Sequence, residues 1–259
     1  MSMVHTRTIS VEPASPETDE SESGSEPPLN ALHEVAIALM AAIVYFGGRL
    51  LIEGGAVEAT RNADRILDIE RTVGIDIERG AQDLVLENDV LRTIGNLSYV
   101  WLHWPLLIGV LIWLFHRSRL RYVQLRNSLI ASGLVGLVLF WVFPAAPPRF
   151  MPGYEGTVSD AARRHYLDYP LRWTNQYASF PSFHIGWTLL VCLALAATFD
   201  SWRKQAVTMI PAVLVGLAVV TTANHYVLDT VAGAGIAFWA YAWFGSRHEL
   251  PTIGLRTPG

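Results

Sequence analysis

Cysteine is almost absent from this sequence, because Cys192 is the only one among 259 residues. The chain therefore has no internal disulfide and no cluster of thiolate metal ligands. Positive charge is also scarce, since 19 Lys and Arg stand against 23 Asp and Glu, for a formal net charge of −4. Without a long basic run to neutralise a phosphate backbone, we expect no nucleic-acid partner.

Charged residues of both signs make up only 16% of the chain, while 51% are hydrophobic and the mean hydropathy is +0.30. Such an apolar composition predicts a membrane protein. Residues 1–30 hold six carboxylates and one arginine among Pro, Ser and Gly, without the apolar block of a signal peptide. We expect a disordered acidic tail at 1–30, a membrane domain at 31–247 and a flexible C-terminal tail at 248–259.

Long apolar runs recur six times, each close to the roughly 20 residues that a helix needs to cross a bilayer. They cover residues 35–52, 94–115, 127–143, 182–199, 206–222 and 225–244. The predicted fold is therefore all-α, a polytopic membrane protein with six transmembrane helices.

The stretch between the first two spans, residues 53–95, is mixed in charge and has helical periodicity. Apolar residues recur there three and four positions apart: Ala63, Ile66 and Leu67, then Ala81, Leu84 and Val85. Short amphipathic helices on the membrane surface fit this pattern. A small soluble subdomain that caps the bundle is the alternative.

Basic residues in short links predict the orientation of the spans. One link carries Arg117, Arg119, Arg121 and Arg126, and the link after Phe199 carries Arg203 and Lys204. With six spans, both links and both termini fall on one side, which the positive-inside rule makes cytoplasmic. We expect a plasma (cytoplasmic) membrane protein. Arginines on the opposite face weaken this count without reversing it: Arg149, Arg163, Arg164 and Arg172.

Three polar segments meet on that opposite, extracytoplasmic face of the predicted bundle. They are PAAPPRF at 144–150, SFPSFH at 179–184 and TTANHYVLD at 221–229. Ionisable residues at the ends of membrane helices are costly unless they face a cavity, so they mark a candidate functional site. The alternative is that each is solvated among the headgroups and has no function.

The third segment pairs a histidine with a carboxylate. His225 and Asp229 are four residues apart, so they share one helix face if the last span starts with Asn224 as its N-cap. A carboxylate there can hold the tautomer and the orientation of the imidazole ring. This pair suits a nucleophile or base together with the group that orients it.

The first two segments offer groups that bind an anion. The start of the fourth span has unpaired backbone N–H groups around Ser182, Phe183 and His184, where the helix dipole favours negative charge. Arg149 follows two prolines and has a planar guanidinium that can bind phosphate through two nitrogens. The full set predicts phosphoryl transfer, in which one histidine attacks phosphorus and the other protonates the leaving group.

Other kinds of site use some of the same residues. The histidines and Asp229 could bind zinc, although the HExxH signature is missing. Ser182 with His225 could form an intramembrane serine hydrolase, although no G-x-S-x-G elbow is present. A lipid or anion transporter could use the same cationic segments without catalysing a reaction.

At these residues the sequence resembles the type 2 phosphatidic acid phosphatase superfamily, and within it the inositol phosphorylceramide synthase-like branch with its actinobacterial members. The resemblance covers about residues 56–235. SFPSFH resembles the second motif of the family and HYVLDTVAG the third, while ERTVGIDIE and NLSYVWLH resemble upstream signatures of the synthase-like branch. The chemical roles of four residues in those upstream segments stay open: Glu70, Glu78, Asn96 and His103.

The resemblance implies that His225 is the nucleophile that forms a phosphohistidine, with Asp229 as its orienter and His184 as general acid. Arg149 would bind phosphate. Ser182, Phe183 and Asn224 are the further substrate-binding candidates, and we expect no metal and no cofactor.

Two departures from the family pattern bear on the reaction. Ala218 and Val219 replace a Ser-Arg pair, and Val142 replaces a lysine seven residues before Arg149. The site is therefore expected to hold fewer cations than ordinary phosphatases. This favours transfer of a phospho-headgroup of the inositol-phosphate type from a lipid donor to a polyol or lipid alcohol.

The alternative is a lipid phosphate phosphatase that hydrolyses phosphatidic acid or a prenyl phosphate. The outer loop, residues 151–178, would decide between water and an acceptor hydroxyl. Its polar residues are headgroup contacts or a solvated lid: Arg163, Arg164, His165, Arg172 and Asn175.

Overall fold

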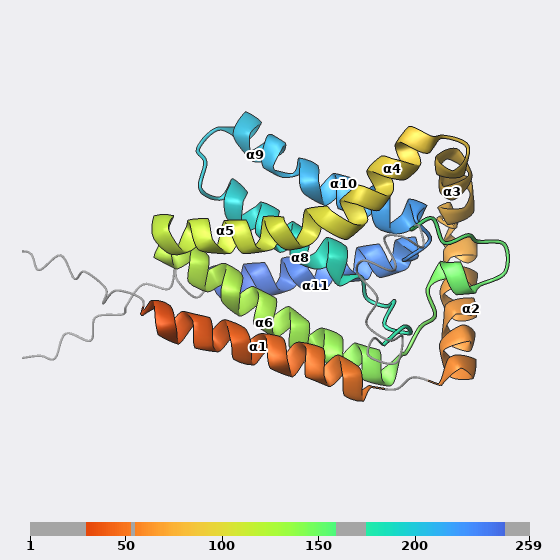
Figure 1. Cartoon of the computed structure of the whole chain (residues 1–259), viewed down its shortest axis with the longest axis horizontal. Helices are drawn as coiled ribbons and strands as arrows, with labels where there is room; N and C mark the ends of the chain where they lie inside the picture. The colour runs from red at the N-terminus through yellow and green to blue at the C-terminus, as the bar shows by residue number, and fades with distance from the viewer. Residues whose placement is uncertain (1–29, 53–54, 159–174, 247–259) are drawn as a thin grey trace, which may run out of the picture.

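The computed structural model of the chain describes residues 30–52, 55–158 and 175–246. The two predicted tails lie outside these ranges except for Asn30, and so do Arg163, Arg164, His165 and Arg172 of the outer loop. Every regular element within the described ranges is a helix (Figure 1), which confirms the all-α fold class.

Within the described ranges, five helical segments are long and apolar enough to cross a membrane. They are α1 (Ala31–Leu51), α4 to α5 with the π-helical turn η1 between them (Asp89–Leu97, Ser98–Leu102, His103–Arg117), α6 (Arg119–Val142), α9 with α10 (Trp202–Thr208, Ile210–Thr221) and α11 (Val227–Ser246). The predicted count of six is not reached by this measure. The stretch predicted at 182–199 instead forms a shorter apolar helix, α8 (Phe183–Ala196).

Helix α8 is short because the chain before it is not helical. Its 14 residues extend about 21 Å, less than the roughly 30 Å of a bilayer's hydrocarbon core. The helix lies inside the bundle, where it packs against α5, α6, α10 and α11. Its side chains are correspondingly buried, including Leu190 and Val191 at no more than 1% exposure. This central position explains its apolar composition.

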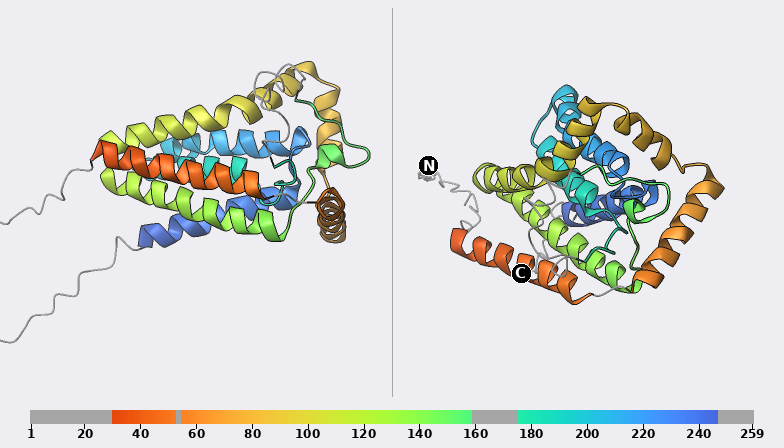
Figure 2. Two further views of the ribbon diagram at one scale, coloured as in Figure 1. Left: turned by 60° about the horizontal axis from the view of Figure 1, so that its bottom comes forward. Right: turned by 45° about the vertical axis from the view of Figure 1, so that its right-hand side comes forward.

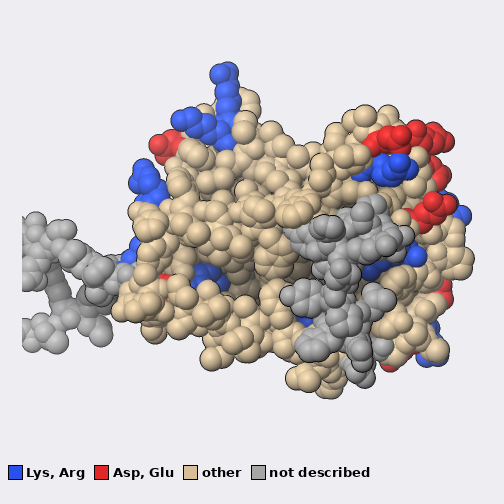
Figure 3. Space-filling view, in the orientation of Figure 1, with Lys and Arg blue, Asp and Glu red and all other residues tan. Residues whose placement is uncertain are grey.

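The bundle has two different ends (Figures 1 and 2). At the terminal end lie Asn30, Ser246 and the one-residue link between α5 and α6 at Ser118. The opposite end is here called the cavity end. Helix α2 (Ala56–Val73) crosses it, and the chain then continues into α3 (Glu78–Leu86). Lys, Arg, Asp and Glu gather toward both ends of the visible face, and a broad band between them carries few charges (Figure 3). That band suits hydrocarbon.

Helix α2 is amphipathic and covers the loops at the cavity end. The apolar part of its buried face consists of Ala59, Ala63, Ile66 and Leu67, which pack against Ala145, Ala146, Met151 and Tyr226. The helix ends at Gly74, whose φ of 74° is the left-handed conformation that glycine adopts readily. The predicted helical periodicity is thus confirmed, while a position on the membrane surface stays a prediction.

Helices α8 and α11 approach each other closely at a glycine. A Cβ atom built on Gly233 would lie 2.0 Å from the backbone oxygen of Ser182, so no side chain fits there. The same contact brings the Ser182 N–H to the Asp229 carbonyl oxygen at 3.0 Å. Gly233 therefore sets the distance between the helices that carry His184 and Asp229.

We expect Gly233→Ala to destabilise the protein by about 1–3 kcal/mol, because a backbone oxygen cannot move aside as a flexible side chain could. The midpoint of thermal unfolding in detergent measures this effect. Gly235→Ala is the matched control on the same helix, since nothing lies within 4 Å of a Cβ atom there. Equal unfolding midpoints for the two variants would contradict the close contact.

Candidate active site

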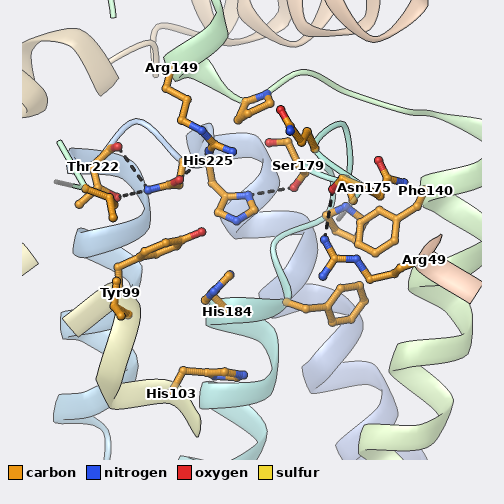
Figure 4. A pocket seen from close by; sticks show the side chains of 18 of the residues that line it. Arg49, Tyr99, His103, Phe140, Arg149, Asn175, Ser179, His184, Thr222 and His225 are labelled. Carbon is orange, nitrogen blue, oxygen red and sulfur yellow. Dashed lines mark hydrogen bonds between the residues drawn. The ribbon is translucent and has the colours of Figure 1, made fainter. Parts of the chain in front are cut away.

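A cavity of about 500 Å³ lies at the cavity end of the bundle (Figure 4). Five of the residues predicted for the site line it: Arg149, Phe183, His184, Asn224 and His225. The other two, Ser182 and Asp229, are fully buried behind its wall at 0% exposure. The structure therefore brings the three predicted segments together around one space.

The turn between α10 and α11 places His225. The carbonyl oxygen of Val219 accepts the N–H groups of both Asn224 and His225, at 3.1 and 3.0 Å. Ala223 takes a φ of 54° so that the chain can reverse direction there. His225 consequently lies before the helix, at the cavity wall, and does not share a helix face with Asp229 as the spacing suggested.

Tyr226, rather than Asn224, occupies the N-cap position of α11. The Tyr226 carbonyl oxygen accepts from the N–H of Thr230 at 3.2 Å, and the Asp229 Oδ2 accepts from the N–H of Tyr226 at 3.1 Å. The second bond is the returning half of a capping box, made by the third residue of the helix. The predicted cap at Asn224 was wrong because its side chain bonds Thr222 and Arg149 instead.

The ring of His225 is held through one nitrogen. Its Nδ1 lies 2.9 Å from the carbonyl oxygen of Ser179 and 3.3 Å from Asp229 Oδ2. Both partners are acceptors, so Nδ1 carries the proton and Nε2 keeps a lone pair. The hydroxyl of Ser179 in turn donates to Asp229 Oδ2 at 2.5 Å. This arrangement leaves the lone pair of Nε2 available for chemistry.

Sequence analysis did not single out Ser179. Its contribution is a backbone carbonyl and a hydroxyl in a non-helical segment, and neither group gives a pattern in a sequence. A serine five residues before a predicted site histidine is too common to be a signal.

His184 faces His225 from the first turn of α8, with the ring centroids 5.8 Å apart. The ring of Tyr99 stacks on His184 at 4.5 Å, and His103 lies 5.5 Å away. Thr188 donates its hydroxyl proton to the carbonyl oxygen of His184 at 2.6 Å, so its oxygen accepts from His103 Nδ1 at 3.0 Å. The upstream segment 96–103 thus surrounds one of the two site histidines.

Arg149 reaches the cavity from the 3-10 turn η2 (Pro148–Phe150). Its Nη1 donates to Asn224 Oδ1 at 2.5 Å, and its backbone N–H donates to the Ala223 carbonyl oxygen at 2.9 Å. Asn224 is itself fixed by its amide, which donates to Thr222 Oγ1 at 2.7 Å. The guanidinium is therefore attached to the same turn that carries His225.

A second arginine, Arg49, lines the cavity from the last turn of α1 (Figure 4). Its Nη2 donates to the carbonyl oxygen of Asn175 at 3.4 Å, while its Nε is buried without a hydrogen-bond partner among the described residues. Sequence analysis missed Arg49, although a cation near the end of an apolar span was an available signal. The site thus gains a cation from outside the recognised motifs.

The start of α8 provides backbone donors beside these cations. Ser182 is the N-cap, so the N–H groups of Phe183, His184 and Ile185 have no acceptor within the helix. The hydroxyl of Ser182 is buried and makes no hydrogen bond within the described ranges, so it does not form the pair with His225 that a serine nucleophile needs. Within those same ranges, no three His, Cys, Asp or Glu side chains are grouped to hold a metal ion.

Taken together, the fold and the cavity define an apolar helical protein with segments able to cross a membrane, and with three histidines, a buried carboxylate and two arginines at one end. The sequence pattern of the PAP2 superfamily matches residues 64–243. The chain therefore belongs to the PAP2 superfamily and is an enzyme of this group of lipid phosphatases and phosphotransferases.

A curated relative is the phosphoinositol dihydroceramide synthase of Bacteroides thetaiotaomicron. It is 21% identical to this chain over 167 residues, which cover 58% of this chain and 54% of the relative. The chain thus matches about half the length of that protein. No solved structure matches the chain.

We expect His225→Ala to abolish turnover and His184→Ala to reduce it about 10²- to 10⁴-fold, if the two histidines are the nucleophile and the proton donor that the sequence predicts. Asp229→Asn should keep measurable but reduced activity, since it misorients the ring without removing it. Turnover of a panel of lipid phosphates by purified variants measures these effects.

His116→Ala, at the terminal end of α5, is the control and should keep full activity. Near-normal turnover of every lipid by both site-histidine variants would show that the site is assigned wrongly. An unchanged gel-filtration profile separates loss of chemistry from loss of folding.

Proposed function

We propose that this enzyme transfers a phosphate-bearing headgroup between a lipid and a hydroxyl group through a phosphohistidine at His225. The observation that carries the proposal is that His225, His184, Arg149 and Arg49 all line the same cavity. Nucleophile, proton donor and two cations for the phosphate oxygens are thereby within reach of one bound group.

The proposed reaction has two displacements at phosphorus. His225 Nε2 attacks, an N–P bond forms, the P–O bond to the lipid alcohol breaks, and His184 gives a proton to the departing oxygen. A hydroxyl then attacks the same phosphorus, His184 takes its proton, and the N–P bond breaks. Asp229 and the Ser179 carbonyl hold the Nδ1–H group throughout. No metal or other cofactor takes part in these steps.

An inositol-phosphate headgroup is the proposed group transferred. The similarity to the phosphoinositol dihydroceramide synthase of B. thetaiotaomicron supports this choice, as do the departures at Val142, Ala218 and Val219. We accordingly place the chain in the inositol phosphorylceramide synthase-like branch, among its actinobacterial-type members. The acceptor is a polyol or a lipid alcohol.

Hydrolysis of a lipid phosphate such as phosphatidic acid or a prenyl phosphate is the second candidate. Arg49 favours it, because this cation from α1 partly makes up for the cations missing from the family motifs. Water would then replace the acceptor hydroxyl in the second displacement.

The chains of the lipid have a place beside the cavity. An apolar groove of about 610 Å³ is lined by α1, α5 and α6, and it shares four residues with the cavity: Tyr45, Phe46, Trp104 and Trp187. The two spaces are therefore adjacent. We propose that hydrocarbon chains lie in the groove while the phosphate lies between Arg49 and Arg149.

The proposed placement in the plasma membrane has six crossings, with α8 as the short one and α2 and α3 at the surface. The cavity end faces the extracytoplasmic side and the terminal end the cytoplasm, because Arg117, Arg119 and Arg121 adjoin the Ser118 link. Arg126 does not add to this count, since it pairs with the buried Glu34 at 2.5 Å.

The first test incubates the purified enzyme in mixed micelles with headgroup-labelled phosphatidylinositol and with a panel of lipid phosphates that includes phosphatidic acid, each with and without alcohol acceptors, and separates the products. We expect the phospho-headgroup to appear on an acceptor, with little free phosphate. Free phosphate from phosphatidic acid regardless of acceptor would identify a phosphatase. No turnover of any lipid phosphate would reject both candidates.

The groove is tested by filling it. We expect Ala41→Trp to raise the KM for a long-chain lipid at least tenfold and to affect a short-chain analogue much less, because the indole occupies the space of the chains. Leu39→Trp is the matched control on α1, since Leu39 is 59% exposed and does not line the groove. Equal effects on long and short chains would contradict the proposed location of the chains.

A further inference from the structure

Two glutamates are buried side by side at the start of α11. Glu70 comes from α2 and Glu78 is the first residue of α3, and both are 0% exposed. Buried carboxylates are costly unless their oxygens are hydrogen-bonded or their charge is removed. They lie in the segment 70–78, for which the sequence suggested no chemical role.

Both glutamates bind backbone N–H groups of α11. Glu78 Oε1 accepts from the N–H of Val227 at 2.8 Å, and Glu70 Oε1 accepts from the N–H of Leu228 at 2.6 Å. The preceding N–H, of Tyr226, donates to Asp229. Three successive donors at the positive end of α11 thus go to three carboxyl groups, two of which come from outside the helix.

The Oε2 atoms of the two glutamates indicate that the pair shares a proton. Glu70 Oε2 and Glu78 Oε2 are buried, and no N–H or O–H donor from the described part of the chain reaches either of them. Burial raises the pKa of Glu70 to about 9, and the neighbouring carboxyl groups of Glu78 and Asp229 add to this rise, while the hydrogen bond from the Leu228 N–H opposes it. At neutral pH Glu70 therefore keeps its proton.

The other ionisable groups around the pair do not neutralise it. Tyr154 and Tyr226 face it from the loop after η2 and from the start of α11, and burial raises the pKa of Tyr154. Arg71 is on the exposed side of α2, where it pairs with Asp68 at 3.3 Å. Arg79 lies over the ring of Tyr154 and donates to the carbonyl oxygen of Pro152.

We propose that Glu70 and Glu78 are a positioning pair that shares one proton and fixes the start of α11, and thereby Asp229 and His225, against the cavity. The pair also joins the α2–α3 segment to the helix that carries Asp229. The role of the pair in catalysis rests on the proposed function of His225. The shared proton is independent of that function.

The variants separate positioning from a general loss of structure. In Glu70→Gln, the amide reproduces the protonated acid, because its oxygen can accept from Leu228 and its nitrogen can donate to Glu78. We expect this variant to keep kcat and KM within twofold of the parent at pH 7. Glu70→Ala should lower kcat at least tenfold with KM within twofold. Glu58→Gln, exposed on the same helix, is the control and should change neither.

The pH dependence of kcat distinguishes a shared proton from a merely structural contact, which would not change it. In the parent enzyme kcat should fall as pH rises through about 9, because loss of the shared proton places two negative charges together. The folded state also keeps a proton that the unfolded chain releases above about pH 4.5, so stability should decline between these values. Glu70→Gln should remove both the alkaline fall of kcat and this decline of the unfolding midpoint.

An infrared spectrum tests the shared proton without any substrate. A carbonyl band of a buried protonated carboxylic acid should be present at pH 7 and missing in Glu70→Gln. Absence of this band in the parent, or an unchanged alkaline limb in Glu70→Gln, would overturn the proposal. If Glu70→Ala does not fold, the infrared band and the pH profile of kcat in Glu70→Gln still test the proposal. Failure of the proposed phosphoryl transfer would leave the band unaffected, so the two failures are distinguishable.

Discussion

The hydrogen bonds of Asp229 hold the two sides of the cavity together. Its carboxylate oxygen Oδ2 accepts from the Ser179 hydroxyl, the His225 ring and the Tyr226 N–H, while its carbonyl oxygen accepts from Ser182. One buried residue thereby joins the start of α11, the turn before it and the segment before α8. Burying the carboxylate is costly, and these donors offset the cost only when all of the segments are in place.

This constraint explains the way α8 begins. A longer helix would place residues 179–182 in helical geometry and withdraw the Ser179 hydroxyl and carbonyl from Asp229 and His225. The chain stays non-helical there, and Gly233 allows it to come close to α11. A short central helix and an oriented histidine are therefore two results of the same contact.

Sequence patterns predicted the parts of this enzyme that depend on local chemistry. Apolar runs identified the long helices, and His184, His225 and Arg149 were predicted to share a site because their spans end at a common face; all three line one cavity. The cap of α11 was predicted wrongly at Asn224, because carboxylates from α2 and α3 supply what a local side chain usually supplies. Arg49 and Ser179 were missed since their importance depends on which chain segments meet, and no single stretch encodes that.

The π-helical turn at Ser98–Leu102 has a consequence for the segment that surrounds His184. A π turn places one more residue in a turn than an α-helix does, so the residues before and after it follow different angular phases. Removing one residue there would shorten the helix by about 1.5 Å, which a bilayer tolerates, but would rotate one half by about 100° against the other. The additional residue of the π turn therefore changes the direction in which Tyr99 and His103 point while it hardly changes the length of the helix.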